Sequence, residues 1–548
     1  MLLFLSEVKV RVAKAFHIFA IILILFSWGV KSYAADIPFS LDRQTTFVVS
    51  TTQYEWWLIR WAYNEFVCQI FVEHEGLPTS EEVFNACGKQ VYDEWRNTPP
   101  CPAAEKGAQA ASTCSGLYLF AVGSRVGEKT VTIDLPPPSV WIELEGCTST
   151  PPNNLCQSLP SLRLVGEEPL PNEHITAIHA ILDGVPYSCE GETCTIPLKP
   201  TLFLGMELEF WAESSFGDTS EHYKAKVRVL DRGVAMDKDS GNWYVDVLSS
   251  QWRGGRVDSC ALLWDAFPPL GEVPDWLETP SEKDFLASEE PYYYLAGRLI
   301  ANGFVDASEC PAGGLLENGY ANSCGLEKAR PSVEEWQNQF DASILKVAQE
   351  INLPATLVKR LFAKESQFWP GEFRIVKEFG LGQITDLGAD AILIWNPSFF
   401  QKFCPTQLDK NVCAKGYLRL NEEERALLRG ALAVQANADC EDCPNGINLT
   451  QAELSITLFA QGLLANCGQV ARSVYNASGK PPGEVSKYED LWRFTLANYH
   501  VGPGCTSYAL YTTWQSREPL DWEHVSTHFT EYCQSAVPYV NEVTESVH

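Results

Sequence analysis

Apolar residues in the C-terminal part of the chain recur every three or four positions. This period is typical of amphipathic helices that pack one face on a core. It predicts six helices, over residues 340–351, 354–364, 422–435, 451–475, 491–497 and 522–543. We therefore expect an all-α domain over residues 336–548, with a disulfide-bearing insertion on its surface.

The pattern in residues 139–230 is different. Short runs alternate between apolar and polar residues, as at 140–144 and 224–229, and turns rich in Gly, Pro, Asn and Cys separate them. Alternation with period two is typical of strands with one buried face. We predict a small Ig-like β-sandwich. Such a domain could bind carbohydrate or act as a spacer, and we favour the spacer because no binding face is evident.

Residues 35–135 form a unit rich in tryptophan. Within 54–74, Trp57, Trp61, Phe66 and Ile70 recur at helical spacing, and a second helix is predicted over 80–95. We interpret these aromatic residues as core rather than as a ligand platform. The expectation is a mainly helical N-terminal unit, followed by a proline-rich linker.

Residues 231–335 are predicted to be a connecting segment stapled by cysteines, with a helix over 290–303. Residues 237–241 faintly resemble a calcium-binding loop, but the glycine falls one place early and the closing glutamate is missing. We interpret them as a turn. The predicted fold class is thus multidomain, with a helical N-terminal unit, a β-sandwich and an all-α C-terminal domain.

The length of the chain indicates how many domains to expect, and its charge indicates which partners are disfavoured. The chain has 548 residues, more than one hydrophobic core usually organises. It carries 41 Lys and Arg against 70 Asp and Glu, a net charge of -29. Binding nucleic acid needs clustered basic residues to neutralise phosphates. The acidic balance therefore argues against a nucleic-acid partner.

Residues 1–34 are typical of an export signal. Basic residues at Lys9, Arg11 and Lys14 precede an apolar run over 16–30, and small residues before Ala35 suit cleavage. The run is shorter than the roughly 20 residues that span a bilayer. We expect a secreted, extracytoplasmic protein. An uncleaved membrane anchor is the alternative.

The 18 cysteines all follow this segment, and an even number in an oxidising compartment predicts disulfides. Four local pairs are expected, at Cys68/Cys87, Cys101/Cys114, Cys147/Cys156 and Cys189/Cys194. Three cysteines lie in 260–324 and seven in 404–533, so a bridge should join these regions. Cys440 and Cys443 have redox-motif spacing, but no βαβ pattern surrounds them, which favours structural pairing.

Glu365 is the candidate catalytic residue. It lies at the end of the helix that Pro354 opens, beside Phe362, Phe368 and Trp369. Apolar surroundings should raise the pKa of a carboxyl group, which lets it act as a general acid near neutral pH.

Two later motifs strengthen the assignment. Gly380, Leu381, Gly382 and Gln383 form a glycine-rich turn, and residues 498–504 read Asn-Tyr-His-Val-Gly-Pro-Gly. In this order after Glu365-Ser366, they resemble the catalytic domain of the bacterial soluble lytic transglycosylases of glycoside hydrolase family 23, relatives of goose-type lysozyme. Tyr539-Val540 is similar to the closing helix of that family.

The resemblance implies a lysozyme-like fold for residues 336–548 and peptidoglycan glycan strands as the substrate. It implies that Glu365 is the acid/base, that Ser366, Gly380, Leu381 and Gln383 line the glycan-binding region, and that Tyr499 and His500 contact the sugar. No metal or cofactor is implied. The sequence departs from the family pattern at Gly382, where methionine is usual, and at His500, where asparagine is usual.

Two alternatives stay open. A hydrolytic lysozyme would need a second carboxylate, for which Asp386, Asp390 and Glu378 are candidates. A non-catalytic protein could bind cell-wall glycans, and residues 35–335 could associate with the cell envelope. His524 and His528 have the spacing of a metal pair, but no central glutamate or third ligand accompanies them.

Overall fold

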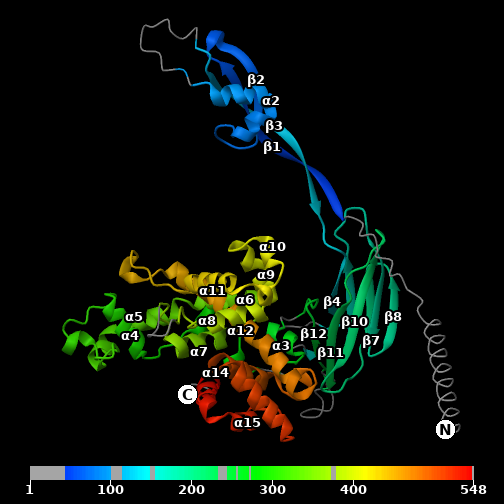
Figure 1. Ribbon diagram of the computed structural model, residues 1–548. Helices are drawn as coiled ribbons and strands as arrows, with labels where there is room; N and C mark the ends of the chain where they lie inside the picture. Colours follow the sequence, from blue (N-terminus) through cyan, green and yellow to red (C-terminus); the bar gives the residue numbers. More distant parts are fainter. Residues whose placement is uncertain are drawn as a thin grey trace, which may run out of the picture. The chain divides into compact units, whose positions relative to one another are not determined.

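The computed structural model describes residues 43–99, 101, 114–147, 155–231, 243–254, 257–270, 273–371 and 378–545. The predicted signal peptide, residues 1–34, and the faint calcium loop at 237–241 lie outside these ranges. The chain divides into two compact units (Figure 1). The first ends at Pro136 and also includes Pro169–Pro171, and the second contains Pro137–Glu168 and the chain from Asn172 onward.

The first unit is a three-stranded antiparallel sheet with one helix. The strand order is β2-β1-β3, and the elements are β1 (Gln44–Arg60), η1 (Ala62–Asn64), β2 (Glu65–Val72), α2 (Ser80–Asn97) and β3 (Leu117–Asp134). Helix α2 packs on one face of the sheet, and the Cys68–Cys87 disulfide ties it to β2 (Figure 1). Beyond β2, the strands β1 and β3 continue as a two-stranded ribbon.

This unit corrects the predicted fold class. The expected helix over 54–74 is wrong, because β1 and β2 cover those residues. Threonine, valine and aromatic side chains favour a pleated strand, and here both faces carry large apolar residues, which hides the period of two. The helix expected over 80–95 is confirmed as α2, which begins with a capping box of Thr79 and Glu82. The unit is rich in strands and not mainly helical.

The second unit begins with two sheets that share one core. A three-stranded sheet has the order β4-β6-β9 and a six-stranded sheet the order β5-β12-β11-β10-β7-β8. One apolar core includes residues of both sheets. The strands are β4 (Ser139–Glu145), β5 (Leu155–Cys156), β6 (Ser161–Glu167), β7 (Ile175–Leu182), β8 (Val185–Glu190), β9 (Thr193–Pro197), β10 (Met206–Ser214), β11 (Tyr223–Asp231) and β12 (Trp243–Leu248).

The runs at 140–144 and 224–229 are strands, within β4 and β11. The sheet continues beyond the expected boundary at residue 230, because β12 pairs with β11.

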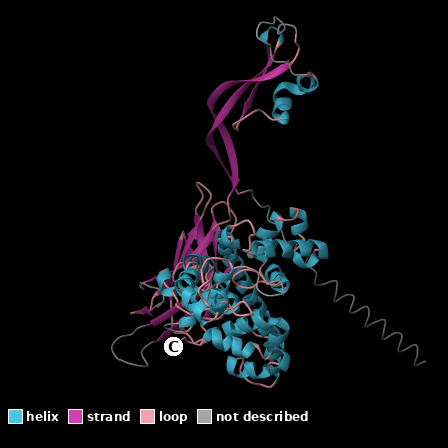
Figure 2. Ribbon diagram, turned by 90° about the vertical axis from the view of Figure 1, so that its left-hand side faces the viewer, coloured by secondary structure: helices cyan, strands magenta, loops and turns pink. Residues whose placement is uncertain are grey.

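Helices dominate the rest of the second unit (Figure 2). The α-helices are α3 (Ser259–Trp264), α4 (Tyr293–Ala301), α5 (Ser323–Asn338), α6 (Asp341–Ile351), α7 (Ala355–Ser366), α8 (Asp386–Trp395), α9 (Pro397–Phe403), α10 (Lys410–Cys413), α11 (Glu422–Ala436), α12 (Leu449–Ser478), α13 (Pro482–Val485), α14 (Tyr488–Gln515), α15 (Trp522–Val525) and α16 (Ala536–Thr544). Short 3-10 turns are η3 (Asp275–Leu277), η4 (Lys283–Leu286), η5 (Pro311–Gly314), η6 (Cys404–Thr406), η7 (Tyr417–Arg419), η8 (Pro444–Gly446), η9 (Ser526–His528) and η10 (Glu531–Cys533).

Most of the predicted C-terminal helices are confirmed, as α6, α7, α11, α12 and the first half of α14. The helix expected over 522–543 is wrong, because α15, η9, η10 and α16 replace it. The segment 231–335 was expected to connect two domains. Its part from Cys260 onward instead shares one apolar core with α6, α7 and α12.

Helix α12 is the centre of this core and contacts α3, α6, α8, α11, α13 and α14. By length and composition it is apolar enough to cross a membrane. However, 61% of its most apolar window is buried inside the unit. We therefore interpret α12 as a core helix.

All 18 cysteines are paired. The four predicted local pairs are confirmed, and Cys440 pairs with Cys443. The predicted bridge between the two odd groups is Cys260–Cys467, which joins α3 to α12. The remaining pairs are Cys310–Cys324, Cys404–Cys413 and Cys505–Cys533. Nine disulfides fit a secreted or extracellular protein.

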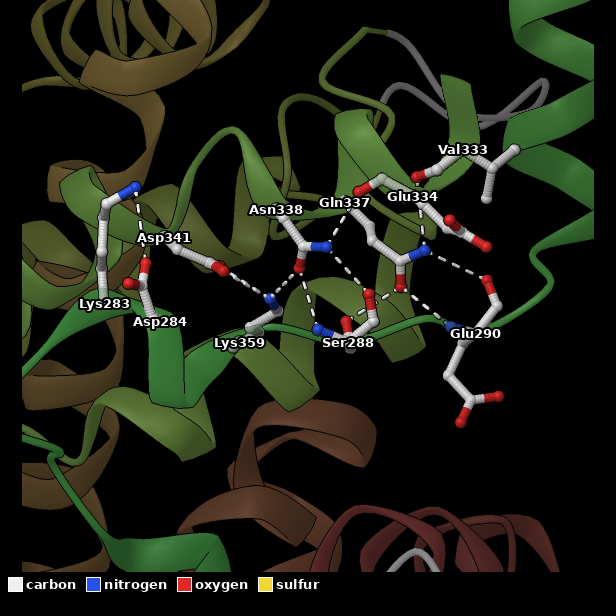
Figure 3. Close-up of polar contacts among 10 residues, drawn as sticks. All are labelled: Lys283, Asp284, Ser288, Glu290, Val333, Glu334, Gln337, Asn338, Asp341 and Lys359. Atoms are coloured by element: carbon white, nitrogen blue, oxygen red, sulfur yellow. Dashed lines mark hydrogen bonds and ion pairs between the residues drawn. The ribbon is translucent and has the colours of Figure 1, made fainter. Parts of the chain in front are cut away.

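A buried polar network fixes α7 against its neighbours (Figure 3). Lys359 Nζ lies 2.7 and 2.8 Å from the two carboxylate oxygens of Asp341, and donates to Asn338 Oδ1 at 2.8 Å. Asn338 and Gln337 in turn hold the segment around Ser288 by hydrogen bonds. Lys359 and Asp341 are 5% and 3% exposed.

Breaking this pair should destabilise the second unit. We expect Lys359→Met to lower the free energy of unfolding by about 3 to 5 kcal/mol, because Asp341 is then buried without its partner. The double variant Lys359→Met/Asp341→Leu should lose less than this single variant. Urea unfolding followed by tryptophan fluorescence measures both.

The control is Lys346→Met, which removes an exposed pair with Glu350 at 4.0 Å. Its expected cost is at most about 0.5 kcal/mol. Equal costs at positions 346 and 359 would contradict a structural role for the buried pair.

Candidate functional site

Glu365 lies on the last turn of α7, which ends where Gln367 and Phe368 adopt left-handed backbone conformations. Its side chain is half-buried, and its Oε1 accepts a hydrogen bond from the Tyr539 hydroxyl on α16. Burial, followed by the charge of Glu365, raises the pKa of Tyr539 well above its ordinary value. The hydroxyl therefore stays protonated and remains a donor to Glu365 Oε1.

The Gly380–Gln383 turn lies against the end of α7. Ser366 Oγ donates to the Leu381 carbonyl at 2.8 Å, which joins helix and turn. Gly380 has φ +76°, and a Cβ there would lie 2.5 Å from the Ala436 carbonyl oxygen. Only glycine suits that position, since it tolerates both the conformation and the close approach. Gly380 and the hydrogen bond from Ser366 to Leu381 therefore fix the backbone conformation of this turn.

Gly382 lies against Phe459 of α12. A Cβ on residue 382 would overlap the Phe459 ring, which is 1% exposed. That ring packs against Phe362 at 4.8 Å and against the edge of Tyr499 at 5.7 Å between ring centroids. Phe459 thus fills the space in which any side chain at position 382 would begin.

Tyr499 lies on α14, three residues before the helix is interrupted at Gly502, which has φ 83°. Its hydroxyl donates to the Gly382 carbonyl. Burial raises the pKa of Tyr499, and the charges of Glu365 and Glu378 raise it further. Next to it, buried Asn498 donates to Asn466 and Gln469 and fixes α14 on α12.

His500 stacks on Tyr539. The two rings are 4.0 Å apart and inclined by 7°. Partial burial and the positive charge of Lys364 lower the pKa of His500 below its ordinary value of 6.5. The imidazole is therefore uncharged at neutral pH, and it covers the ring whose hydroxyl binds Glu365.

The segments that carry the seven predicted site residues contact one another. The residues themselves differ in how far they are exposed. Glu365 and Tyr499 are half-buried, and His500 is exposed. The other four are buried, with Ser366 and Leu381 at 0% and Gln383 at 6% exposed. These buried residues position the turn rather than face solvent. Gln383 Nε2 binds the Gly380 carbonyl at 2.6 Å.

Tyr539 and Phe459 were not predicted as site residues. The signal for Tyr539 was its likeness to the closing helix of the family. Phe459 carried no sequence signal, because it lies inside a long apolar helix where every large residue suits a core.

Three carboxylates were candidates for a second catalytic role. Asp390 accepts a hydrogen bond from Tyr417 and pairs with Arg429 at 3.2 Å, which commits it to a separate apolar cluster. Asp386 is exposed on the first turn of α8. Glu378 acts on Tyr499 by its charge, as Glu365 does. It is thus the candidate that shares the surroundings of Glu365.

Each histidine of the C-terminal pair binds a carboxylate side chain. His524 pairs with Asp521 at 2.6 Å and His528 with Glu518 at 2.6 Å. Over the described ranges, no three His, Cys, Asp or Glu side chains gather as a metal site would require.

Two cavities of the second unit lie elsewhere. One of about 520 Å³ is lined by Phe203, Tyr488 and Leu520 among others, and one of about 670 Å³ lies beside Phe400 and Tyr417. Neither is lined by Glu365. The site around Glu365 is defined by its hydrogen bonds and not by either cavity.

No protein-family model matches the chain, and no curated protein matches it either. Among solved structures, a polysaccharide lyase is similar over 80% of this chain and 55% of that chain, at 10% sequence identity and a TM-score of 0.14. The chain thus spans about half the length of that lyase. At this TM-score the likeness carries no argument about fold or activity.

A methyl group at position 382 should disturb the site. We expect Gly382→Ala to lower stability by about 1 to 3 kcal/mol, because the Phe459 ring must move. The second change in Gly382→Ala/Phe459→Leu should recover part of that loss. Thermal unfolding measures both variants. The matched control is Gly430→Ala in α11, where nothing lies within 4 Å of the new Cβ. A similar loss in this control would contradict the steric explanation.

Acid should weaken the stack of His500 on Tyr539. A histidine with a lowered pKa favours the folded state above pH 6.5, and this contribution is lost as the pH falls below 6.5 and the imidazole gains a proton. His500→Phe keeps an aromatic ring and cannot titrate. Between pH 7.5 and 5.5, we expect the melting temperature of the wild type to fall further than that of the variant. Parallel curves would show that His500 does not contribute.

Proposed function

We propose that the chain is an exported lytic transglycosylase, which cleaves peptidoglycan between N-acetylmuramic acid and N-acetylglucosamine with Glu365 as the acid/base. The observation that carries the proposal is the hydrogen bond from Tyr539 to Glu365, made where the three motif segments meet. This contact holds the carboxyl group of Glu365 in place beside the turn and α14. The nine disulfides fit the compartment in which peptidoglycan lies.

The reaction needs one carboxyl group. Glu365 gives its proton to the glycosidic oxygen as the bond from that oxygen to C1 of the muramoyl residue breaks. The 6-hydroxyl of the same residue then attacks C1 and passes its proton to Glu365. The acetamido group of the substrate assists. The products are a 1,6-anhydromuramoyl end and a free 4-hydroxyl, and no water is consumed.

The other residues of the site position Glu365. Tyr539 orients Oε1, and His500 covers the tyrosine ring. Tyr499 and Ser366 donate to consecutive carbonyl groups of the turn, at Gly382 and Leu381, and so hold it between α14 and α7. Hydrogen bonds and packing of this kind around a catalytic group keep it in one geometry before the substrate binds.

A hydrolytic muramidase is the second candidate, and Glu378 is the observation that favours it. Ordinary glycosidases use two carboxyl groups, the second to activate water or to act as the nucleophile. The charge of Glu378 acts on Tyr499 together with that of Glu365. In this alternative Glu378 would supply the second carboxylate.

Digestion of purified peptidoglycan distinguishes the candidates. Mass spectrometry of the released fragments should show anhydromuramoyl ends, and Glu365→Gln should lower the rate by roughly 10²- to 10⁴-fold because the acid/base is lost. Glu378→Gln should change the rate less than about threefold, since the transglycosylase reaction does not use Glu378.

The proposal would be wrong if the fragments had ordinary reducing ends and Glu378→Gln lowered the rate as much as Glu365→Gln. The reaction would then be hydrolysis. Release of no fragments by the wild type would exclude both reactions on this substrate and leave a glycan-binding protein.

A further inference from the structure

One face of the sheet in the first unit is rich in uncovered aromatic side chains. The register of the strands shows which residues share this face, because residues directly opposite each other in an antiparallel pair point to the same side. Trp57 lies opposite Gln69 on one side and Phe120 on the other, and Ile59 lies opposite Phe66 and Tyr118.

Helix α2 covers the other face. Leu58 lies opposite Cys68 and Leu119, and these residues belong to the apolar cluster that packs against α2. Arg60, two residues further along β1, forms an ion pair with Glu94 of α2. Trp57 precedes Leu58 and therefore points away from α2.

We define the open aromatic face by the rings that the α2 cluster does not include. They are Trp57, Trp61, Phe66, Phe71, Tyr118 and Phe120. Phe66 is 53% and Phe120 47% exposed, and the other four are partly exposed. The sequence had suggested that Trp57, Trp61, Phe66 and Ile70 form a core. Ile70 does so, at 0% exposed, but the three rings lie outside the apolar cluster, and for them that interpretation is wrong.

The rings of the open aromatic face support one another. Trp57 contacts Phe66 edge to face at 5.5 Å, and Trp61 contacts Tyr118 at 5.1 Å. These contacts hold the rings in place at the surface without burying them. Exposed apolar patches of this kind mark interaction sites on proteins.

Polar groups accompany the rings. Glu55 Oε1 accepts hydrogen bonds from Trp57 Nε1 at 2.7 Å and from Gln69 Nε2 at 2.6 Å. The Arg125 guanidinium lies over the Phe71 ring at 3.8 Å from its centre. The face thus combines aromatic surfaces with a carboxylate, an amide and a guanidinium, which can bind hydroxyl groups.

We propose that the open aromatic face binds an uncharged glycan chain. The C–H groups of a pyranose ring carry partial positive charge, and they are attracted to the electron-rich faces of aromatic rings. Sugar hydroxyls would bind Glu55, Gln69 and Arg125 at the same time. An extended chain of sugars suits this face, because successive sugars can lie on successive rings along the strands.

Charge decides between possible occupants. The chain carries a net charge of -29, so a second copy or a polyanion would be repelled at close range. On the open aromatic face itself, the Glu55 carboxylate is balanced by the Arg125 guanidinium. A neutral polysaccharide matches a face without net charge on an acidic protein.

This inference does not depend on the proposed catalysis, because the open aromatic face and Glu365 belong to different units. The test uses the full chain with Glu365→Gln in every sample, so cleavage cannot remove the ligand. Co-sedimentation with insoluble chitin, cellulose and purified peptidoglycan gives a Kd for each.

We expect chitin to bind the Glu365→Gln protein, and Phe66→Ala and Phe120→Ala each to raise the Kd about tenfold, as loss of a central aromatic contact does. Phe120→Leu keeps most of the apolar volume and loses the ring, so it should also weaken binding. The matched control is Phe84→Ala on α2, where the side chain is 42% exposed. It should change the Kd less than twofold.

Three results would overturn the proposal. The first is no binding to any of the three polysaccharides. The second is binding that the substitutions on the open aromatic face leave unchanged. The third is a dimer in analytical ultracentrifugation that Phe120→Ala dissociates, which would assign the face to a second copy. Thermal unfolding of each variant verifies folding, and Phe120→Leu keeps the test valid if an alanine variant does not fold.

Discussion

The ion pair between Lys359 and Asp341 is the constraint on which the arrangement around α7 depends. Burial lowers the pKa of Lys359 and raises that of Asp341, so removal from water opposes both charges. The pair persists because its geometry is close and Asn338 adds a hydrogen bond. Sliding or turning α7 would separate two charges inside an apolar core. The helix is therefore held in one register, and Glu365, six residues later, emerges on a different side of it.

Backbone carbonyl groups transmit this constraint to the site. The Gly380–Gln383 turn presents consecutive carbonyls, and α7 and α14 each donate one side-chain hydroxyl to them. The surroundings of Glu365 are thus fixed by α7, α14 and the turn. Phe459 of α12 packs against all three, at Phe362, Tyr499 and Gly382. Substitutions at buried positions such as Ser366 or Phe459 should affect the site through shape, although neither side chain faces solvent.

The sequence predicted what local pattern controls. Apolar residues at helical spacing predicted α6, α7, α11 and α12. The resemblance of three motif segments to a known family selected Glu365, Gln383 and Tyr499, which lie in segments that the fold brings together. The prediction from sequence failed where the same spacing of apolar residues is compatible with both a helix and a pair of strands. Trp57, Trp61 and Phe66 are four and five residues apart, which suits a helix, yet they belong to two strands and the turn between them. The odd numbers of cysteines predicted a bridge between two regions, but only the packing of α3 on α12 selects Cys260 and Cys467.

The first unit enters and leaves through paired residues. Gln44, at the start of β1, lies directly opposite Asp134, at the end of β3, and Arg43 donates to the Pro136 carbonyl at 2.8 Å. Ends that lie side by side in this way let a folded segment be joined to another protein at a single place. The same two ends could therefore graft the sheet and its helix into a surface loop of another protein.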